Sequence, residues 1–357
     1  MIRIEIEPVW RFRRDGQPGA MLVMLGFLNE IRETGKITRA ADSVGLSYRH
    51  CWNLIEKWSE FFGTPLVNRK RGSGTELTPF GERLVWAGQR LEARLGPQLQ
   101  NLSQELETQI NQFLPHGPIV RVHASHGFAI SALREMLSGE SNIDIDLRYV
   151  SNQNSLVSLA HGACDLAGLH LPQGELRSKS IAAIKDWLNP DAHRVIGFVT
   201  REMGLMVKPG NPLEITSLES LVDPRVRFVN RDPDSGTRLL FDLMLREHGI
   251  DAQRINGYEN AEFTHAAVAA YVASDMADAC FGVEAAARHF DLDFVRLVTE
   301  DYLFVCHRQT LDQEPVKRLL AIMKSDAFKE AIAAIPGYKV SDPGVVKTVK
   351  EIIRQAA

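Results

Sequence analysis

The feature that most constrains this chain is a change in hydrophobic pattern near residue 118. Before it, apolar residues recur every three or four positions, which predicts helices. After it, short apolar runs typical of strands alternate with helical stretches. The turn-forming letters "PHGP", residues 115–118, stand at the change. We therefore predict a helical N-terminal part and a separate α/β domain over 118–357.

Composition is that of a globular protein, with 45% hydrophobic and 24% charged residues. No apolar run approaches the roughly 18 residues of a membrane helix, and the N-terminus lacks the apolar core of a signal peptide. The four cysteines have no C-x-x-C spacing, and the histidines form no H-E-x-x-H motif. We expect a cytoplasmic protein without disulfides, metal ion, other resident cofactor or membrane contact.

Residues 1–80 have the pattern of a helix-turn-helix. Helices are expected at about 20–33 and 38–44, and Ser47 can cap a third helix after the turn. The third helix places apolar residues on one face, namely Cys51, Leu54, Ile55, Trp58 and Phe62. Arg49 and Asn53 point the other way, where such side chains read guanine and adenine in the major groove.

A wing is predicted after the third helix, in "LVNRKRGSGTELT". Two extended stretches flank a glycine-rich turn whose cations would meet phosphates. Residues 1–80 also hold 12 Lys or Arg against 9 Asp or Glu, in a chain of net charge −4. An ordinary three-helix unit with a solvated charged face is the alternative, but the combination favours binding of double-stranded DNA. The candidate DNA contacts are Ser47, Tyr48, Arg49, Trp52, Asn53, Lys57, Arg69, Lys70 and Arg71.

These motifs resemble a known family. The run from "ETGKITRAADSVGLSYRHCWNLIEKW" to "LTPFGERL" is similar to the N-terminal domain of the molybdate-responsive ModE regulators and, more distantly, to LysR-type regulators. The S-Y-R-x-x-W letters fit ModE better, and the L-T-x-x-G letters of the wing fit both. The match covers about residues 20–90. It implies a winged helix-turn-helix transcription regulator.

A linker helix is predicted over 81–117. Its apolar residues are spaced seven, four, seven, four and seven apart, as in a two-helix seam, namely Leu84, Leu91, Leu95, Leu102, Leu106 and Phe113. Gly96-Pro97 interrupts this pattern and is expected to kink it. The seam can pack on its own head, but two-fold operators favour a homodimer through this helix, with a tetramer also compatible.

Repeated strand–helix units after residue 118 predict α/β layers around largely parallel sheets. The expected strands are "IVRVHA", "IDIDLRYV", "CDLAGLHL", "RVIGFVT", "GLMVKPG", "VRFVN", "DACFGV" and "YLFVCHR". Ligands of such folds lie beyond the carboxyl ends of the strands, near helix N-termini.

Four turns at such positions carry hydrogen-bond donors, which suggests one cleft that binds a small anion. The candidates are Ser125, His126, Thr200, Arg201, Ser235, Gly236, Thr237, Arg238, Thr264 and His265. The plainer alternative makes Ser235 a helix cap and Arg238 the partner of Asp242. His170 is a further, weaker candidate.

This region also has a resemblance. "GLMVKPGNP", "FVNRDPDSGTRLLFDLML" and "THAAVAAYVASDMADACFGVEAAA" look like the periplasmic-binding-protein-like domain of bacterial oxyanion-related regulators. That resemblance implies two α/β lobes with a ligand cleft between them. Molybdate and tungstate carriers of this fold use neutral donors, so Arg201 and Arg238 leave room for a carboxylate. Molybdate, tungstate, sulfate and formate remain open as the effector. No part resembles the C-terminal molybdate-binding domains of ModE.

We expect a ModE-like or LysR-type regulator whose DNA affinity or bending responds to a small anion, and no enzyme. The alternative is a serine hydrolase that uses Ser125, since "VHASHG" places this serine between a strand and a helix. His123 replaces the first glycine of the G-x-S-x-G motif, however, and no acid and histidine partners are evident.

Overall fold

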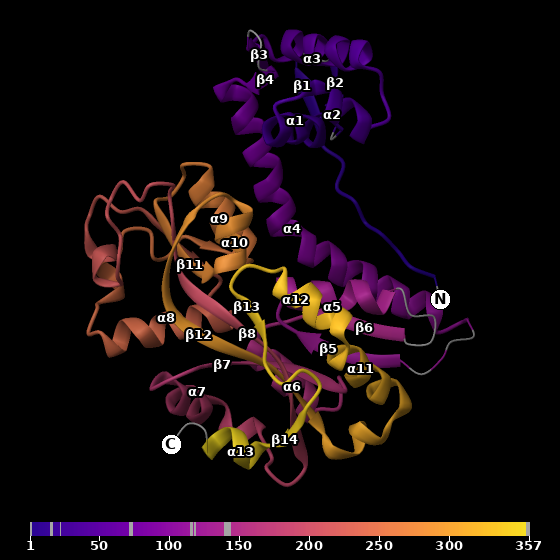
Figure 1. The fold of residues 1–357 in the computed structure, drawn as a ribbon, viewed down its shortest axis with the longest axis vertical. Coiled ribbons are helices and arrows are strands. Elements are labelled where there is room, and N and C mark those ends of the chain that lie inside the picture. Colours follow the sequence, from indigo (N-terminus) through magenta and orange to yellow (C-terminus); the bar gives the residue numbers. More distant parts are fainter. Residues whose placement is uncertain are drawn as a thin grey trace. The chain divides into compact units, whose positions relative to one another are not determined.

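The computed structural model describes residues 2–14, 17–21, 23–70, 74–114, 117, 119–138 and 144–354. The chain forms two compact units. The first, here called the head, comprises residues 6–92; the second, called the body, comprises residues 1–5 and 93–357. Helix α4 (Pro79–Asn111) contributes to both units (Figure 1). None of the described helices is long and apolar enough to cross a membrane.

The head is a winged helix-turn-helix, as predicted. Its elements are β1 (Arg11–Arg14), β2 (Gln17–Met21), α1 (Val23–Thr34), α2 (Ile37–Ser43), α3 (Tyr48–Phe62), β3 (Val67–Lys70) and β4 (Gly74–Leu77). The wing is the antiparallel pair β3–β4. The hairpin β1–β2 was not predicted, because its short strands show no regular alternation of apolar and polar residues.

Helix α3 packs on the head as its apolar face predicts. Ser47 caps it, since its hydroxyl accepts a hydrogen bond from the His50 amide at 3.3 Å. Cys51, Ile55 and Trp58 are buried, and Trp58 meets Phe27 of α1 edge to face with ring centroids 5.8 Å apart. Burial of each such side chain contributes about 1.5–3 kcal/mol, so this cluster fixes α3 against α1.

The L-T-x-x-G motif joins the wing to α4. The Thr78 hydroxyl donates to the Pro65 carbonyl at 2.7 Å and accepts from the Gly81 amide at 3.1 Å. A Cβ atom at Gly81 would lie 2.3 Å from the Leu66 carbonyl oxygen, so this position requires glycine. Gly74 in the wing is also required, because its φ is +118° and a Cβ would collide with the Gly35 carbonyl.

Helix α4 is a single helix of 33 residues with Pro97 in its interior, so Gly96-Pro97 does not end it. The N-terminal residues of the chain lie along its C-terminal end. The Asn111 side chain accepts from the Ile2 amide and donates to the Ile2 carbonyl, both at 2.8 Å. The Ile4 amide donates to Glu107 at 2.8 Å. Residues 1–5 therefore belong to the body, although the head follows them in sequence.

The body contains a ten-stranded sheet flanked by helices. Its first elements are β5 (Ile119–Ala124), α5 (Phe128–Ser138), β6 (Asp144–Tyr149), α6 (Asn152–Ala160), β7 (Leu166–Pro172), α7 (Leu176–Ile184) and β8 (His193–Val207). Then follow β9 (Phe228–Arg231), α8 (Gly236–Glu247), β10 (Ala261–Glu262), α9 (His265–Ala273), β11 (Ala279–Val283), α10 (Glu284–His289) and β12 (Asp293–His307). The last are α11 (Glu314–Lys324), α12 (Asp326–Ala333), β13 (Tyr338–Val340), β14 (Val346–Thr348) and α13 (Val349–Arg354).

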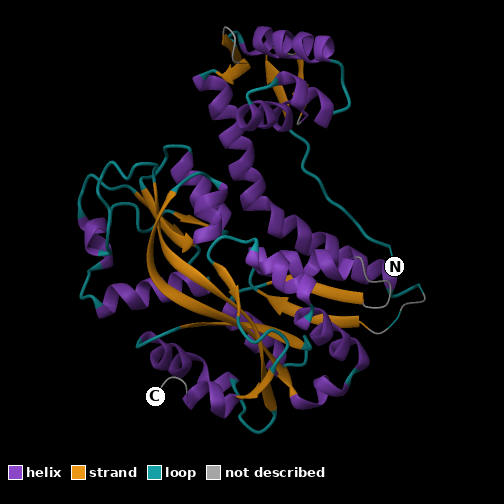
Figure 2. Cartoon of the chain, viewed as in Figure 1, coloured by secondary structure: helices purple, strands orange, loops and turns teal. Residues whose placement is uncertain are grey.

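Two long strands divide the body into two lobes. The main strand order is β10-β9-β11-β8-β12-β7-β5-β6, and β8 pairs with β12 along almost its whole length. Lobe 1 carries β5–β7, β13 and β14 on one half of this ribbon, and lobe 2 carries β9–β11 on the other (Figures 1 and 2). This two-lobed α/β architecture was predicted.

Two details of the sheet differ from the prediction. "RVIGFVT" and "GLMVKPG" are one continuous strand, β8, because Thr200 to Met203 pair with Val298 to Asp301 instead of turning. The sheet is also not largely parallel: the outer strands of each lobe run parallel, but β7, β12, β8 and β11 are antiparallel to their neighbours in the centre. Strands β10, β13 and β14 were missed because they are only two or three residues long.

Each lobe has an aromatic core of its own. In lobe 1, Phe198 of β8 stacks on Phe328 of α12 at 5.6 Å and contacts Phe304 of β12. In lobe 2, Phe241 of α8 stacks between Phe228 and Phe281, at 5.1 and 5.3 Å. Two separately packed cores joined by a ribbon allow the lobes to move against each other as rigid bodies.

Candidate functional site

A cavity of about 360 Å³ lies between the two lobes of the body. Lobe 1 supplies the loops after β5 and β6 and one residue of β7, and lobe 2 supplies the loops after β9 and β10. Its lining residues are Ser125, His126, Tyr149, Val150, Ser151, Asn154, His170, Arg201, Arg231, Asp232, Asp234, Ser235, Gly236, Thr237, Phe263 and His265. The cavity lies at the carboxyl ends of parallel strands, where α/β folds place ligands.

Four helices begin at this cavity, two from each lobe. Helices α5 and α6 of lobe 1 start just after His126 and at Asn152, and α8 and α9 of lobe 2 start at Gly236 and His265. The first amides of a helix have no acceptor within it, and each N-terminus carries about half a positive charge. Their convergence makes the cavity favourable for negative charge.

Ser235 is the N-cap of α8, which was the plainer of the two predicted roles. Its hydroxyl oxygen accepts from the Arg238 amide at 3.1 Å. The hydroxyl proton remains available to a ligand, as do the first-turn amides of Gly236 and Thr237. A Cβ at Gly236 would lie 3.1 Å from the Cβ of Asn152 in lobe 1, so the lobes already touch beside the cavity.

Arg201 and Glu300 form a buried ion pair where β8 crosses β12. The Glu300 carboxylate lies 2.7 Å from Arg201 Nε and 2.6 Å from its terminal nitrogen, and each residue is 2% exposed. Burial opposes ionisation of Glu300, but the Arg201 charge holds its pKa at about 2. The pair is therefore neutral as a whole, which limits its pull on an anion.

Arg231 is a buried arginine without a carboxylate partner among the described residues. It is 8% exposed, and one terminal nitrogen donates to the Phe263 carbonyl at 2.7 Å. Its Nε and its other terminal nitrogen have no hydrogen-bond partner in the described part of the chain. Burial and the nearby Arg201 charge lower its pKa to about 9, so it stays charged at neutral pH. A charge in this state favours a bound anion.

Three histidines in the cavity are neutral. Burial, together with Arg231, lowers the pKa of His126 to about 4. Burial, together with Arg201, lowers that of His170 to about 4 as well. The pKa of His265 lies well below its ordinary value, again because of burial and the two arginines. Neutral imidazoles can donate or accept hydrogen bonds without adding charge.

Seven of the ten predicted ligand contacts line the cavity: Ser125, His126, Arg201, Ser235, Gly236, Thr237 and His265. Sequence reasoning weighed His170 and omitted Arg231 and Glu300. Arg231 stands at the end of β9 directly before "DPDSGT", which was a usable signal. Glu300 carried none, because only the register of β12 on β8 places it beside Arg201.

The other three candidates do not line the cavity. Thr200 neighbours Arg201 on a strand, so its side chain points to the opposite face. Arg238 is bonded to Asp242 at 3.0 Å and lies over the ring of Tyr258 at 4.0 Å, so it is held within lobe 2. Thr264 caps α9 and also donates to the Ala93 carbonyl of α4 at 2.9 Å.

On the head, α3 exposes Arg49, Asn53 and Lys57 along one face, and Tyr48 is 52% exposed beside them. Trp52 is half-buried, edge to face with Tyr48, and the Arg69 guanidinium lies 4.1 Å from its ring. Trp52 therefore positions Arg69 of the wing. Of the other wing cations, Arg71 and the Lys70 side chain lie outside the described residues.

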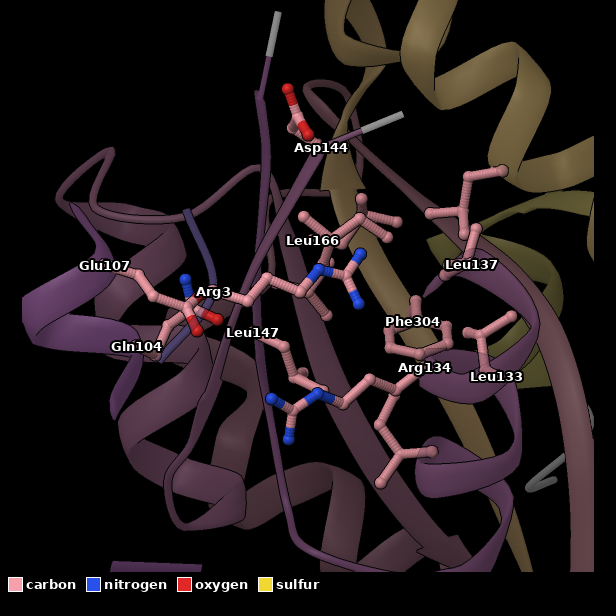
Figure 3. A pocket seen from close by; sticks show the side chains of 14 residues that line it. Arg3, Gln104, Glu107, Leu133, Arg134, Leu137, Asp144, Leu147, Leu166 and Phe304 are labelled. Carbon is pink, nitrogen blue, oxygen red and sulfur yellow. The ribbon is translucent and has the colours of Figure 1, made fainter. Parts of the chain in front are cut away.

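A second cavity of about 70 Å³ lies in lobe 1 beside the C-terminal half of α4. Figure 3 shows Arg3 reaching over it from the N-terminal segment and Arg134 from α5, above leucines and Phe304. It contains none of the predicted contacts and is much smaller than the cavity between the lobes. Within the described residues, no group of three His, Cys, Asp or Glu side chains is placed to hold a metal ion.

Comparison with known families covers both units. Residues 22–82 match the family described as bacterial regulatory helix-turn-helix protein, lysR family. Residues 134–324, more than half of the chain, match the PBP superfamily domain.

Individual proteins are similar to parts of the chain. The chain is 31% identical over 199 residues to the uncharacterized protein YvgK of Bacillus subtilis, covering 56% of this chain and 64% of YvgK. It is 34% identical over 112 residues to the molybdenum transport protein ModE of Azotobacter vinelandii, covering 29% of this chain and 42% of ModE. The chain thus spans less than two thirds of these relatives. A hydrogen-peroxide-bound OxyR mutant of Corynebacterium glutamicum aligns with 15% identity and a TM-score of 0.45, over 87% and 94% of the chains.

The fold and the cleft define a two-lobed binding-protein-like module attached to a winged helix-turn-helix. The chain belongs to the PBP superfamily over residues 134–324, and its residues 22–82 match the lysR-family helix-turn-helix. The matched families describe a regulatory head and a binding domain, so the hydrolase alternative has no support. Ser125 also makes no hydrogen bond to a histidine among the described residues; its carbonyl accepts from the Tyr302 hydroxyl at 3.1 Å.

The neutral histidines predict a loss of stability in mild acid. Between pH 6.5, their ordinary pKa, and about 4, the unfolded chain binds protons at His126 and His170 that the folded chain does not bind. The free energy of unfolding should therefore decrease as pH falls through this window, whereas Glu300 adds its own loss only below pH 4.5. Urea unfolding between pH 7 and 5 measures the slope. His170→Gln should flatten it, and the exposed control His289→Gln should not; equal slopes in both variants would contradict the assignment.

Proposed function

We propose that this protein is a transcription regulator that binds double-stranded DNA through its head and responds to a small anion in the cleft of its body. The observation that carries the sensing role is the meeting of four helix N-termini with Arg231, whose Nε and one terminal nitrogen lack partners among the described residues. DNA binding supports a cytoplasmic location and requires no catalytic residue.

The inner part of the cleft suits an anion because a buried cation there has no carboxylate partner. Arg201 is neutralised by Glu300, while Arg231 has no such partner among the described residues; Asp232 and Asp234, which also line the cavity, are more exposed. An anion that accepts from Arg231 and from the α8 amides would satisfy groups that are costly to leave unpaired. ModE relatives are named for molybdenum, so molybdate and tungstate stand beside sulfate and formate as effectors.

The head suits the major groove of DNA. Arg49 and Asn53 lie on the exposed face of α3, with Lys57 one turn further on. In this arrangement arginine can bind guanine and asparagine adenine, while Tyr48 and Lys57 contact the phosphate backbone. Ser47 fixes the start of α3, and the wing brings Arg69, which Trp52 orients. Lys70 and Arg71 remain predicted phosphate contacts.

A homodimer through α4 completes the proposal. Beyond the head, α4 exposes apolar side chains on one face: Leu102 is 50% exposed, Leu106 42% and Ile110 41%, and Phe113 just after the helix is 82% exposed. Their spacing of four, four and three residues is that of a helix–helix seam. A second copy of α4 would bury this surface, and two heads would then bind two half-sites.

An effector that touches both lobes stabilises their closed arrangement, and this is how it would alter DNA affinity or bending. Only a ligand with different affinity for the two arrangements can shift the equilibrium between them. Ser125 and His126 of lobe 1 and Arg231 and Ser235 of lobe 2 line the same cavity, so a single anion can bridge them.

Separate variants should remove the two binding activities independently. With a duplex selected from random DNA by the wild-type protein, Arg49→Ala should weaken binding by about 1–3 kcal/mol, roughly 5- to 150-fold. It should leave unchanged the rise in melting temperature caused by the bound anion. Arg231→Gln should abolish that rise and leave DNA binding without anion intact. Gel shift and thermal shift measure both, with the exposed Glu60→Ala as control; failure of the wild type to select any duplex would refute the DNA-binding role.

The dimer has its own test. Leu106→Glu places a charge in the centre of the exposed seam, so light scattering should give the mass of a monomer instead of a dimer. Gln109→Glu introduces the same charge on a neighbouring face of α4 and should leave the mass unchanged. If Leu106→Glu keeps the wild-type mass, another surface joins the two copies.

A further inference from the structure

The cleft is larger than an oxyanion needs. Its volume of about 360 Å³ is more than twice that of the ~150 Å³ cavity that holds benzene in an engineered protein. Tetrahedral oxyanions have five heavy atoms, and formate has three. The lobes are already close together beside it, since a Cβ added at Gly236 would lie 3.1 Å from the Asn152 Cβ. A Lys179–Glu247 ion pair also joins α7 of lobe 1 to α8 of lobe 2.

The rim of the cavity carries groups that a bare oxyanion would not use. Phe263 lines it and is 37% exposed, so its apolar ring surface is available to a ligand. Its own carbonyl holds Arg231, so ring and anion site are fixed to each other. Asp232 and Asp234 also line the cavity and are more exposed than Arg231. These carboxylates repel additional negative charge at the rim and accept hydrogen bonds from donor groups.

We propose that the effector is an organic anion: a compact anionic group bound at Arg231 and the α8 amides, joined to a planar apolar body that packs against Phe263. The inference rests on the proposed function and narrows its effector class. Molybdate, tungstate, sulfate and formate supply the anionic group without the planar body, so they fill only the inner part of the cleft.

Matched pairs of probes test this inference on the full-length protein. Calorimetry compares inorganic phosphate with phenyl phosphate, and formate with phenylacetate. In at least one pair the aryl compound should bind ten or more times tighter than its parent anion. Phe263→Ala should remove most of that gain and leave the parent anion's affinity unchanged. Leu239→Ala, which changes an exposed apolar residue of α8 outside the cavity, should keep the gain.

The outcomes distinguish the organic-anion inference from the anion-sensing role on which it rests. Equal affinity within both pairs, or a gain that survives Phe263→Ala, overturns the organic-anion inference while the anion-sensing role stands. Absence of binding by all four probes and by molybdate overturns both. Arg231→Gln should lower the affinity for both compounds of a pair by the same factor, because it removes the group that binds the anionic end they share.

A second observation concerns Pro97, which breaks the hydrogen-bond ladder of α4. Proline has no amide proton, so the carbonyl four residues earlier, that of Ala93, has no partner within the helix. The Thr264 hydroxyl donates to this carbonyl at 2.9 Å. Thr264 also caps α9, whose first residue, His265, lines the effector cavity. Because Pro97 leaves the Ala93 carbonyl without a donor in the helix, this carbonyl can accept the hydrogen bond that attaches lobe 2 to α4.

Contacts on the two sides of Pro97 go to different lobes. On the N-terminal side, Arg94 pairs with Glu262 of lobe 2 at 3.6 Å, next to the Ala93–Thr264 bond. On the C-terminal side, the Asn101 side chain makes two 2.8 Å hydrogen bonds to the backbone of Tyr149 in lobe 1. Tyr149 lines the cavity as well. A relative movement of the lobes therefore acts on α4 at both sides of its weakest point.

We infer that the Thr264–Ala93 hydrogen bond transmits the arrangement of the two lobes around the cleft to α4. Gly96-Pro97 serves as the hinge in α4, and the helix passes the change on to the head, into which it continues. Thr264→Val removes the hydroxyl and keeps the shape of the side chain, whereas Thr264→Ser keeps the hydroxyl. Ser325→Ala is a matched control for the lost helix cap, because Ser325 caps α12 and donates to a carbonyl without touching α4.

Gel shifts of the full-length protein with and without saturating phenyl phosphate, and with and without molybdate, measure the coupling. In Thr264→Val the ratio of DNA affinities should fall to about one, while the thermal shift caused by each anion persists. Thr264→Ser and Ser325→Ala should keep the wild-type ratio. A wild-type ratio in Thr264→Val, or its loss in Ser325→Ala as well, overturns the inference.

Discussion

Arg231 in the cleft is the constraint on which the arrangement of the body depends. A guanidinium that is 8% exposed and has two nitrogens without partners among the described residues is costly to bury. Glu300 is committed to Arg201, and burial together with the two arginine charges keeps the pKa of the histidines low, so they stay neutral. Helix N-termini add more positive potential. These groups support the proposal that the cleft binds an anion.

The ribbon of β8 and β12 explains why this site lies between the lobes. Both strands run through both lobes, and Arg201 and Glu300 face each other where they cross from one to the other. Their neutral pair allows the crossing point to be buried without adding charge to the cleft. Each lobe contributes two helix N-termini to the cavity. Under the proposed function, an anion that contacts both lobes stabilises the arrangement in which they are close together.

Features of the fold and the site that depend on neighbouring residues were predicted from the sequence. Features that depend on pairing between residues far apart in the chain were not. The helix-turn-helix, the wing and the caps at Ser47 and Ser235 follow from short-range patterns. Such patterns do not show which of Arg231 and Arg238 faces the cavity. Both flank the same turn, and only the fold shows that Asp242 and Tyr258 occupy Arg238.

The same reasoning explains the errors in the sheet. The polar residues Thr200, Arg201 and Glu202 interrupt the apolar pattern, so two strands were predicted here instead of one. In the structure these residues continue β8, because the partner strand supplies Glu300 opposite Arg201, 99 residues away. When the partner of a buried charged residue is so distant in sequence, the local pattern around that residue predicts an exposed turn. The ends of such strands, and Glu300 itself, therefore lay beyond prediction from one sequence.

The head has two covalent connections to the body, and this bears on how a signal in the cleft can act. One is α4, bonded to lobe 2 at Ala93 and to lobe 1 at Asn101. The other is the N-terminal segment, held on α4 by Glu107 and Asn111. A domain joined by one flexible linker averages out movements of its anchor, because the linker absorbs them. Both connections are anchored on α4, on opposite sides of Pro97, so under the proposed relay a change in α4 near Pro97 alters one connection relative to the other. The double attachment therefore supports the proposal that a rearrangement beside the cleft reaches the head.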